Sequence, residues 1–138
     1  MRRGASTLVI LTIFLLTSHG IGSFFSLYER ISWFDMALHT LGGAWLASIF
    51  IVMGLPRYPS FFAKLPRLRY VLRVMFLVLI AGVLWELYEY GFAVWATTRF
   101  GNLGFSQPLI DTLSDLLSDA AGAAPVALFL FCKEREVS

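Results

Sequence analysis

Residues 34–56 read FDMALHTLGGAWLASIFIVMGLP, a stretch that predicts a membrane-spanning helix. It is apolar over most of the distance to Pro56, and about 20 such residues make a helix that crosses about 30 Å of hydrocarbon. Two ionisable side chains, Asp35 and His39, nevertheless lie inside it, at a spacing that puts them on one helical face. Because ionisable groups are costly in hydrocarbon, a membrane helix that carries them needs a partner or a purpose for them.

The rest of the chain repeats this pattern. Apolar stretches of similar length lie at about 8–25, 34–55, 74–96 and 109–132. Of the 138 residues, 58% are hydrophobic and 14% are charged, whereas about a quarter of the residues in a soluble domain are charged. We therefore expect an all-α fold: a polytopic integral membrane protein, with one domain over residues 1–138 that forms a four-transmembrane-helix bundle.

The first apolar stretch has two interpretations. Arg2 and Arg3 precede LVILTIFLL, and a run rich in small residues follows from Ser18 to Ser23, which together resemble a secretory signal peptide. We expect an uncleaved membrane helix, with a cleaved signal peptide as the alternative.

The composition excludes several function classes. The net charge of +2 is small, and the basic residues gather at the expected membrane edges, so no nucleic-acid partner is predicted. The single cysteine, Cys132, excludes an intrachain disulfide and a cysteine-based metal cluster.

The positions of Lys and Arg predict the orientation in the membrane. Of the 11 Lys and Arg residues, all but Arg30 and Arg99 precede the first stretch, lie in the connection 56–73 or follow the last stretch. Such an excess marks the cytoplasmic side of a membrane protein. We therefore expect both termini and a basic loop at 56–73 to be cytoplasmic, with the other two connections facing outward.

Ionisable side chains recur in three of the four expected spans. They are Asp35, His39, Glu86, Glu89, Asp111, Asp115 and Asp119. Spacings of three or four residues place the members of each span on one helical face. With a rise of about 1.5 Å per residue, the three faces carry polar groups at matching depths in the outer half of the bilayer. Because none of these faces suits lipid, we expect them to turn inward and share one site.

Several carboxylates in one pocket cannot all stay ionised without a cation. Two like charges about 4 Å apart repel by about 4 kcal/mol at an effective dielectric constant near 20. Either some carboxylates are protonated, or a divalent metal ion lies among them. Carboxylates with a single imidazole suit Zn, Mg, Mn or Fe. The predicted metal ligands are His39, Glu86, Glu89, Asp115 and Asp119.

The two acids nearest the outer surface, Asp35 and Asp111, are the candidate catalytic bases. Each also has a structural interpretation. Ser32 and Asp35 have the spacing of a capping box, and Asp111 falls in a first helical turn, where an acid suits the helix dipole. His19, near the outer end of the first stretch, is predicted to be an interfacial histidine, with a further ligand as the alternative.

Three segments together resemble a known group of proteins. FDMALHTLGGAWLA, GVLWELYEYGF and DTLSDLLSDAAGA are similar to the YjdF-like and VanZ-like group of small bacterial inner-membrane proteins. The shared pattern is Asp-x3-His before Gly-Gly, then Trp-Glu-x2-Glu, then Asp-x3-Asp-x3-Asp before Gly-Ala. The matching residues are Asp35, His39, Gly42, Gly43, Trp85, Glu86, Glu89, Asp111, Asp115, Asp119 and Gly122. The resemblance implies a multi-pass protein of the bacterial inner membrane. VanZ-like members are associated with glycopeptide resistance at the cell envelope.

The expected site favours one function and leaves two alternatives. The leading hypothesis is a metal-dependent hydrolase of an envelope lipid or lipid-linked substrate, in which the ion activates a water molecule. The alternatives are a proton or cation transport element and a non-catalytic accessory subunit of a larger membrane complex. The bilayer is the expected partner in each case, and a homo-oligomer or a partner membrane subunit fits all three. Whether the chain is an enzyme stays open at this level.

Overall fold

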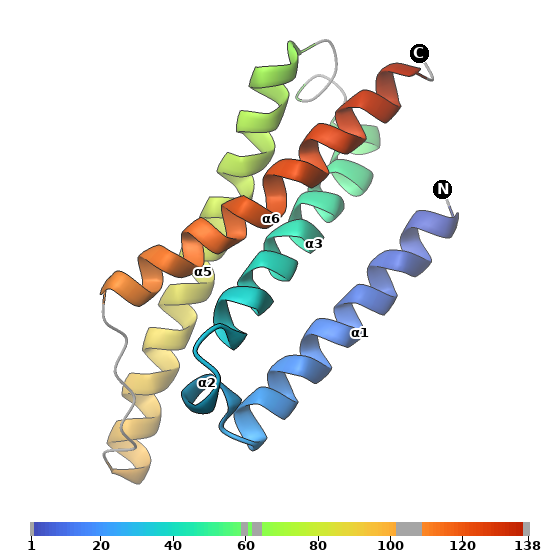
Figure 1. Cartoon of the computed structure of the whole chain (residues 1–138). Coiled ribbons are helices and arrows are strands. Elements are labelled where there is room, and N and C mark those ends of the chain that lie inside the picture. The colour runs from blue at the N-terminus through green and yellow to red at the C-terminus, as the bar shows by residue number, and fades with distance from the viewer. Residues whose placement is uncertain (1, 59–60, 62–64, 102–108, 137–138) are drawn as a thin grey trace.

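The protein is all-α in the part of the chain that the computed structural model describes, residues 2–58, 61, 65–101 and 109–136. Within these residues there is no strand. The helices are α1 (Arg2–Phe24), α2 (Leu27–Arg30), α3 (Phe34–Arg57), α5 (Arg67–Phe100) and α6 (Leu109–Glu136), as Figure 1 shows. The short helix α2 lies in the turn between α1 and α3.

Four helices are long and apolar enough to cross a membrane. Their candidate spans are Ser6–Phe24, Phe34–Gly54, Arg67–Phe100 and Leu109–Cys132. Because every backbone polar group must be paired inside hydrocarbon, continuous helices are what such sequences form there. The prediction of an all-α fold with four transmembrane helices is confirmed.

The basic connection predicted at 56–73 is shorter in the structure. Helix α3 continues through Pro56 to Arg57, and α5 begins at Arg67, inside the predicted loop. Pro56 lies in the last turn of α3, where its missing N–H removes a hydrogen bond only as the helix ends. Pro66 directly precedes α5, where the first N–H groups of a helix have no helical partner anyway. The connection between α3 and α5 therefore covers fewer residues than the predicted loop 56–73, and a proline lies near each of its ends.

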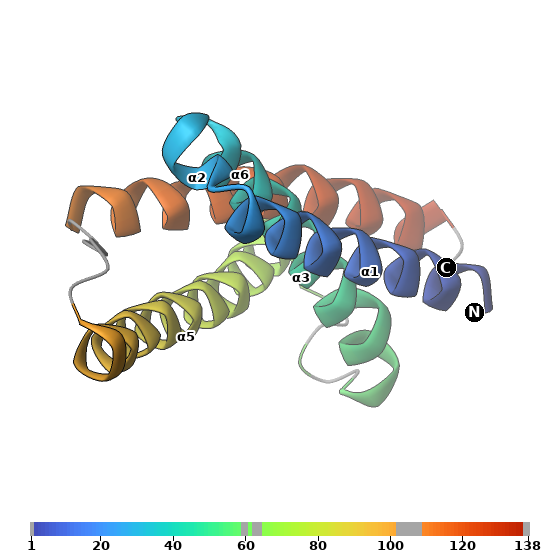
Figure 2. The same cartoon turned by 90° about the horizontal axis from the view of Figure 1, so that it is seen from below.

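Helix α3 is the centre of the bundle. It packs along α6 most extensively and also contacts α5 and α1, while α5 packs on α6. Helix α1 lies at the edge, against α3 and α2 (Figures 1 and 2). The apolar core lies toward the end of the bundle where the two chain termini lie (Figure 1). It comprises Ala47, Ile51, Tyr70, Val71, Val74, Val78, Ala123, Ala127 and Phe131.

Two glycines set the close approach of α3 and α6. A Cβ atom on Gly43 would collide with the carbonyl oxygen of Asp119, and one on Gly122 would collide with the carbonyl oxygen of Thr40. Small residues at such contacts let helix backbones approach closely in membranes. Because Thr40 follows His39 in the chain, this contact brings the acidic face of α6 onto the histidine of α3.

The outer surface of the bundle is apolar. On α1 the side chains of Val9, Ile10, Ile13 and Phe14 are each more than half exposed. Contiguous apolar surface of this kind marks an interaction with lipid or another protein. Together with the helix lengths, it indicates that hydrocarbon surrounds these helices.

Candidate metal centre

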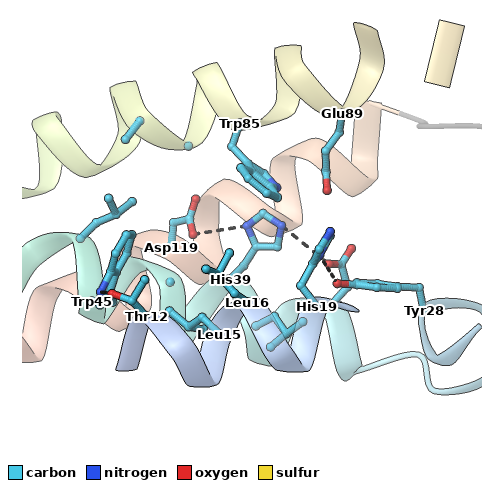
Figure 3. Close-up of a pocket in the computed structure, with 16 residues that line it drawn as sticks. Thr12, Leu15, Leu16, His19, Tyr28, His39, Trp45, Trp85, Glu89 and Asp119 are labelled. Carbon is cyan, nitrogen blue, oxygen red and sulfur yellow. Dashed lines mark hydrogen bonds and ion pairs between the residues drawn. The ribbon is translucent and has the colours of Figure 1, made fainter. Parts of the chain in front are cut away.

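His39 of α3 is the centre of the polar cluster. Its Nε2 atom lies 3.7 Å from Oδ1 of Asp35, one turn earlier on the same helix, and 4.0 Å from Oε1 of Glu86 on α5. Its Nδ1 atom lies 3.3 Å from Oδ1 of Asp119 on α6, as Figure 3 shows. The side chains of three helices therefore meet at one imidazole, as the matching depths predict.

Two overlapping groups of potential ligands share this histidine. Ligand atoms of Asp35, His39 and Asp115 lie within 4.8 Å of one another, and so do those of His39, Glu86 and Glu89. Two ligands on one ion, each bonded at about 2.1 Å, lie at most about 4.2 Å apart. Side-chain shifts of less than about 1 Å would therefore bring either group around a single ion.

The cluster contains buried oxygens that accept no hydrogen bond. The side chains of His39, Glu86 and Asp119 are 9%, 7% and 6% exposed. In the described part of the chain, both carboxylate oxygens of Glu86 and Oδ1 of Asp115 are enclosed without a hydrogen-bond partner. The Thr112 side chain on α6 neighbours Glu86, but its geometry leaves both oxygens without a hydrogen bond. A buried ionised carboxylate without a partner costs several kcal/mol of folding free energy. We therefore expect a proton or a cation to bind these oxygens.

Asp119 lies on a different side of the imidazole from Asp35 and Glu86. The sequence predicts it as a ligand, yet its carboxylate contacts Nδ1 and belongs to neither ligand group. An ionised carboxylate accepts a hydrogen bond from Nδ1–H, and this leaves the Nε2 lone pair facing Asp35 and Glu86. Carboxylates in this position orient metal-bound histidines and raise their basicity.

The two candidate bases lie in different surroundings. Asp35 lies beside His39, with its side chain 33% exposed. The residue that caps α3 is Trp33, and no side-chain cap hydrogen bond forms, so the capping-box alternative for Asp35 is wrong. Asp111 is exposed in the first turn of α6 and belongs to neither ligand group. Its position fits the interpretation in which it complements the helix dipole.

A cavity of about 310 Å³ opens beside the cluster. Its lining residues come from all the described helices, and Asp35, His39, Glu89 and Asp119 are among them. Its apolar wall comprises Leu15, Leu16, Leu38, Leu46, Ala81 and the ring of Trp45. A mostly apolar cavity with a few polar groups at one place is the usual form of a small-molecule site.

A second polar pair, His19 of α1 and Tyr28 of α2, lines the same cavity. His19 Nδ1 and the Tyr28 hydroxyl lie 2.6 Å apart (Figure 3). Burial raises the pKa of the Tyr28 phenol, and the nearby carboxylates of Asp35 and Glu89 raise it further. The phenol therefore stays protonated and can donate its O–H to His19. The sequence predicts His19 as interfacial, and a turn between the two residues hides their pairing from any helical spacing.

The comparison with known families identifies a membrane protein group. The family model described as "Predicted membrane protein (DUF2238)" matches residues 3–136. It supports the membrane assignment, and it does not confirm the likeness to YjdF-like or VanZ-like proteins. No curated protein matches the chain, and no solved structure does. With four candidate spans and a match over nearly its whole length, the chain is a multi-pass membrane protein that belongs to the DUF2238 family.

Proposed function

We propose that this protein binds a divalent metal ion at His39 and uses it to hydrolyse an envelope lipid or a lipid-linked substrate in the bacterial inner membrane. The observation that carries the proposal is the set of enclosed, unpartnered oxygens of Glu86 and Asp115 around His39. An ion would neutralise carboxylates that, among their described contacts, no Lys or Arg side chain reaches. Imidazole with carboxylates suits Zn, Mn, Fe or Mg.

The donor set divides into ligands and an orienting group. His39 through Nε2, Glu86 and Glu89 form one ligand group, which includes the enclosed carboxylate of Glu86, while Asp115 shares the other group with His39 and Asp35. Asp119 holds the imidazole through Nδ1. When bound in such a site, a divalent ion lowers the pKa of a coordinated water molecule and polarises the bond to be cleaved.

Asp35 is the candidate general base in this proposal. Its side chain is 33% exposed, more than those of Glu86 and Asp119, and it lines the cavity where a substrate would lie. A base must lie within hydrogen-bond reach of the proton it removes, and Asp35 alone among the two candidates lines the cavity. Asp111 is exposed at the start of α6 and takes no catalytic role here.

The structure gives less support to conduction of protons or cations. A pathway needs polar steps on both sides of the membrane midplane. Beyond the cluster, toward the termini, the described core is largely apolar, with Ala47, Val74 and Val78 among its members, and the hydroxyl of Tyr70 is its polar side-chain atom. The acids therefore form a chamber that is closed on one side by packed apolar residues.

The test is the metal content of protein purified in detergent without added metal. We expect about one equivalent of a divalent ion in the wild type and at least about a tenfold lower content in Glu86→Gln, since removing a metal ligand costs more than the 10–100-fold loss typical of outer-shell changes. Glu29→Gln is the matched control, because Glu29 is an exposed acid on α2. Wild-type protein that carries no metal and keeps its fold and stability in chelator would end the metal proposal.

A further inference from the structure

The cavity beside the cluster is open toward the surroundings of the bundle. Leu16 of α1 and Trp85 of α5 both line it, yet they are 67% and 40% exposed. Residues that line a cavity and also face outward mark its rim. The rim therefore lies between α1 and α5, on the surface that hydrocarbon covers.

Helices α1 and α5 leave room for such an opening. Helix α1 packs on α3 and α2, and in the described part of the chain it does not pack extensively against α5. The two helices meet through the rings of His19 and Trp85, whose centroids lie 5.8 Å apart. The floor between them is α3, which contributes Leu38, Gly42 and Leu46.

The wall away from the acids offers no free polar group in its described contacts. Trp45 donates its indole N–H to the Thr12 hydroxyl at 2.9 Å, and Thr12 in turn donates to the carbonyl oxygen of Leu8 at 2.8 Å. With these donors used, the surface of Leu15, Leu38 and Leu46 is effectively hydrocarbon. Such a surface favours an alkyl group over water because burying apolar area is favourable.

We propose that one hydrocarbon chain of a membrane lipid lies in this groove between α1 and α5, with the polar linkage of that lipid at Asp35, His39 and Glu89. The inference rests on the proposed function and assigns its substrate to lipids that reach the site sideways from the bilayer. The groove is continuous with the lipid-facing surface through Leu16 and Trp85, and its polar groups lie at one end. This arrangement matches the division of a lipid into a chain and a head.

Substitution of Gly42 is the most specific way to block the groove. Gly42 lines the groove, and a Cβ atom added there meets nothing within 4 Å. A larger side chain can therefore begin at this position without a collision at its Cβ atom, and we expect leucine to fill part of the groove. Gly91 on α5 is the matched control, because it is a helical glycine whose added Cβ also meets nothing within 4 Å and because it does not line the groove.

The probe is a phosphatidylglycerol whose acyl chain carries a diazirine, mixed into vesicles that hold the full-length protein. After illumination, mass spectrometry maps the labelled residues. We expect wild-type label on the groove residues Leu15, Leu38 and Ala81. We expect label at these residues to fall at least about tenfold in Gly42→Leu, since losing the contacts of about two buried methylenes has that effect, and to persist in Gly91→Leu.

The labelling pattern of the wild type tests the lipid site by itself, even if Gly42→Leu does not fold. Label confined to the outward residues Ile10, Ile13 and Phe14, as for ordinary lipid contact, would overturn the inference, and so would full groove labelling in a folded Gly42→Leu. Labelling of Glu86→Gln and of metal-loaded protein separates the lipid site from the metal site. Groove labelling that persists in Glu86→Gln supports the lipid site whatever the metal content, whereas metal-loaded protein without groove labelling rejects the lipid site alone.

Discussion

At the scale of single residues, the two nitrogens of His39 have different neighbours and therefore different tasks. Nδ1 lies against Asp119, while Nε2 faces Asp35 and Glu86. Helical spacing in the sequence places all the acids on inward faces, and the structure bears this out for the groups around His39. Spacing cannot tell which ring nitrogen an acid contacts, because that depends on the χ angles of the histidine and on the tilt between α3 and α6.

Asp119→Asn tests the orienting role. An amide keeps the shape of the side chain and can still accept a hydrogen bond from Nδ1–H, but it lacks the charge that raises the basicity of the ring. We expect metal affinity to fall about 10–100-fold, measured by competition with a chelator of known affinity. Glu29→Gln serves as the control and should bind as the wild type does, because Glu29 is an exposed acid on α2. A loss with Asp119→Asn as complete as that with Glu86→Gln would make Asp119 a ligand.

At the scale of helices, the close contact of α3 and α6 depends on one of two adjacent glycines. Gly43 faces the carbonyl oxygen of Asp119, whereas Gly42 faces open space. The sequence shows both glycines and predicts close packing, since small residues recur on both helices. It does not show which of the pair faces α6, because that depends on the rotation of α3 about its axis, which only the packed structure fixes.

Gly43→Ala should therefore be destabilising and Gly42→Ala should not. A methyl group on Gly43 pushes α6 away from α3, and overpacking of this kind costs about 1–3 kcal/mol. Unfolding in mixed micelles with increasing SDS measures the difference. Equal midpoints for the two variants would contradict the contact. Because Asp119 forms part of it, Gly43→Ala should also weaken metal binding.

The limits of the helices were less predictable than their number. Hydropathy locates the four spans, yet α5 begins at Arg67, within a stretch that its charges mark as a loop. Charged residues at the membrane edge can be helical because water pairs with their side chains while the backbone stays hydrogen-bonded. The pairing of His19 with Tyr28 was equally hidden, since α2 lies between α1 and α3 and turns the chain back.

At the scale of the whole molecule, the acidic chamber and the apolar core occupy opposite ends of one bundle. Both termini lie at the end of the core (Figure 1). The distribution of Lys and Arg predicts that this end is cytoplasmic, so that the chamber lies toward the external face. A substrate drawn from the outer leaflet would then reach the site without crossing the membrane.

Cysteine labelling in intact spheroplasts tests this orientation. In a Cys132→Ser background, Glu29→Cys places a thiol on α2, where the native side chain is exposed. We expect a membrane-impermeant maleimide to label it from outside. The control is the wild-type Cys132, at the other end of the bundle, which should react only after the membrane is broken. The reverse pattern would place the chamber on the cytoplasmic side.

Anomalous X-ray scattering from crystals of the protein grown with Mn²⁺ or Zn²⁺ would show whether His39 binds a metal ion. We expect one peak bonded to His39 Nε2 at about 2.0–2.2 Å, with oxygens of Glu86 and Glu89 completing the shell. Crystals with no peak at His39, in which protons shared between the carboxylates satisfy the oxygens of Glu86 and Asp115, would contradict it.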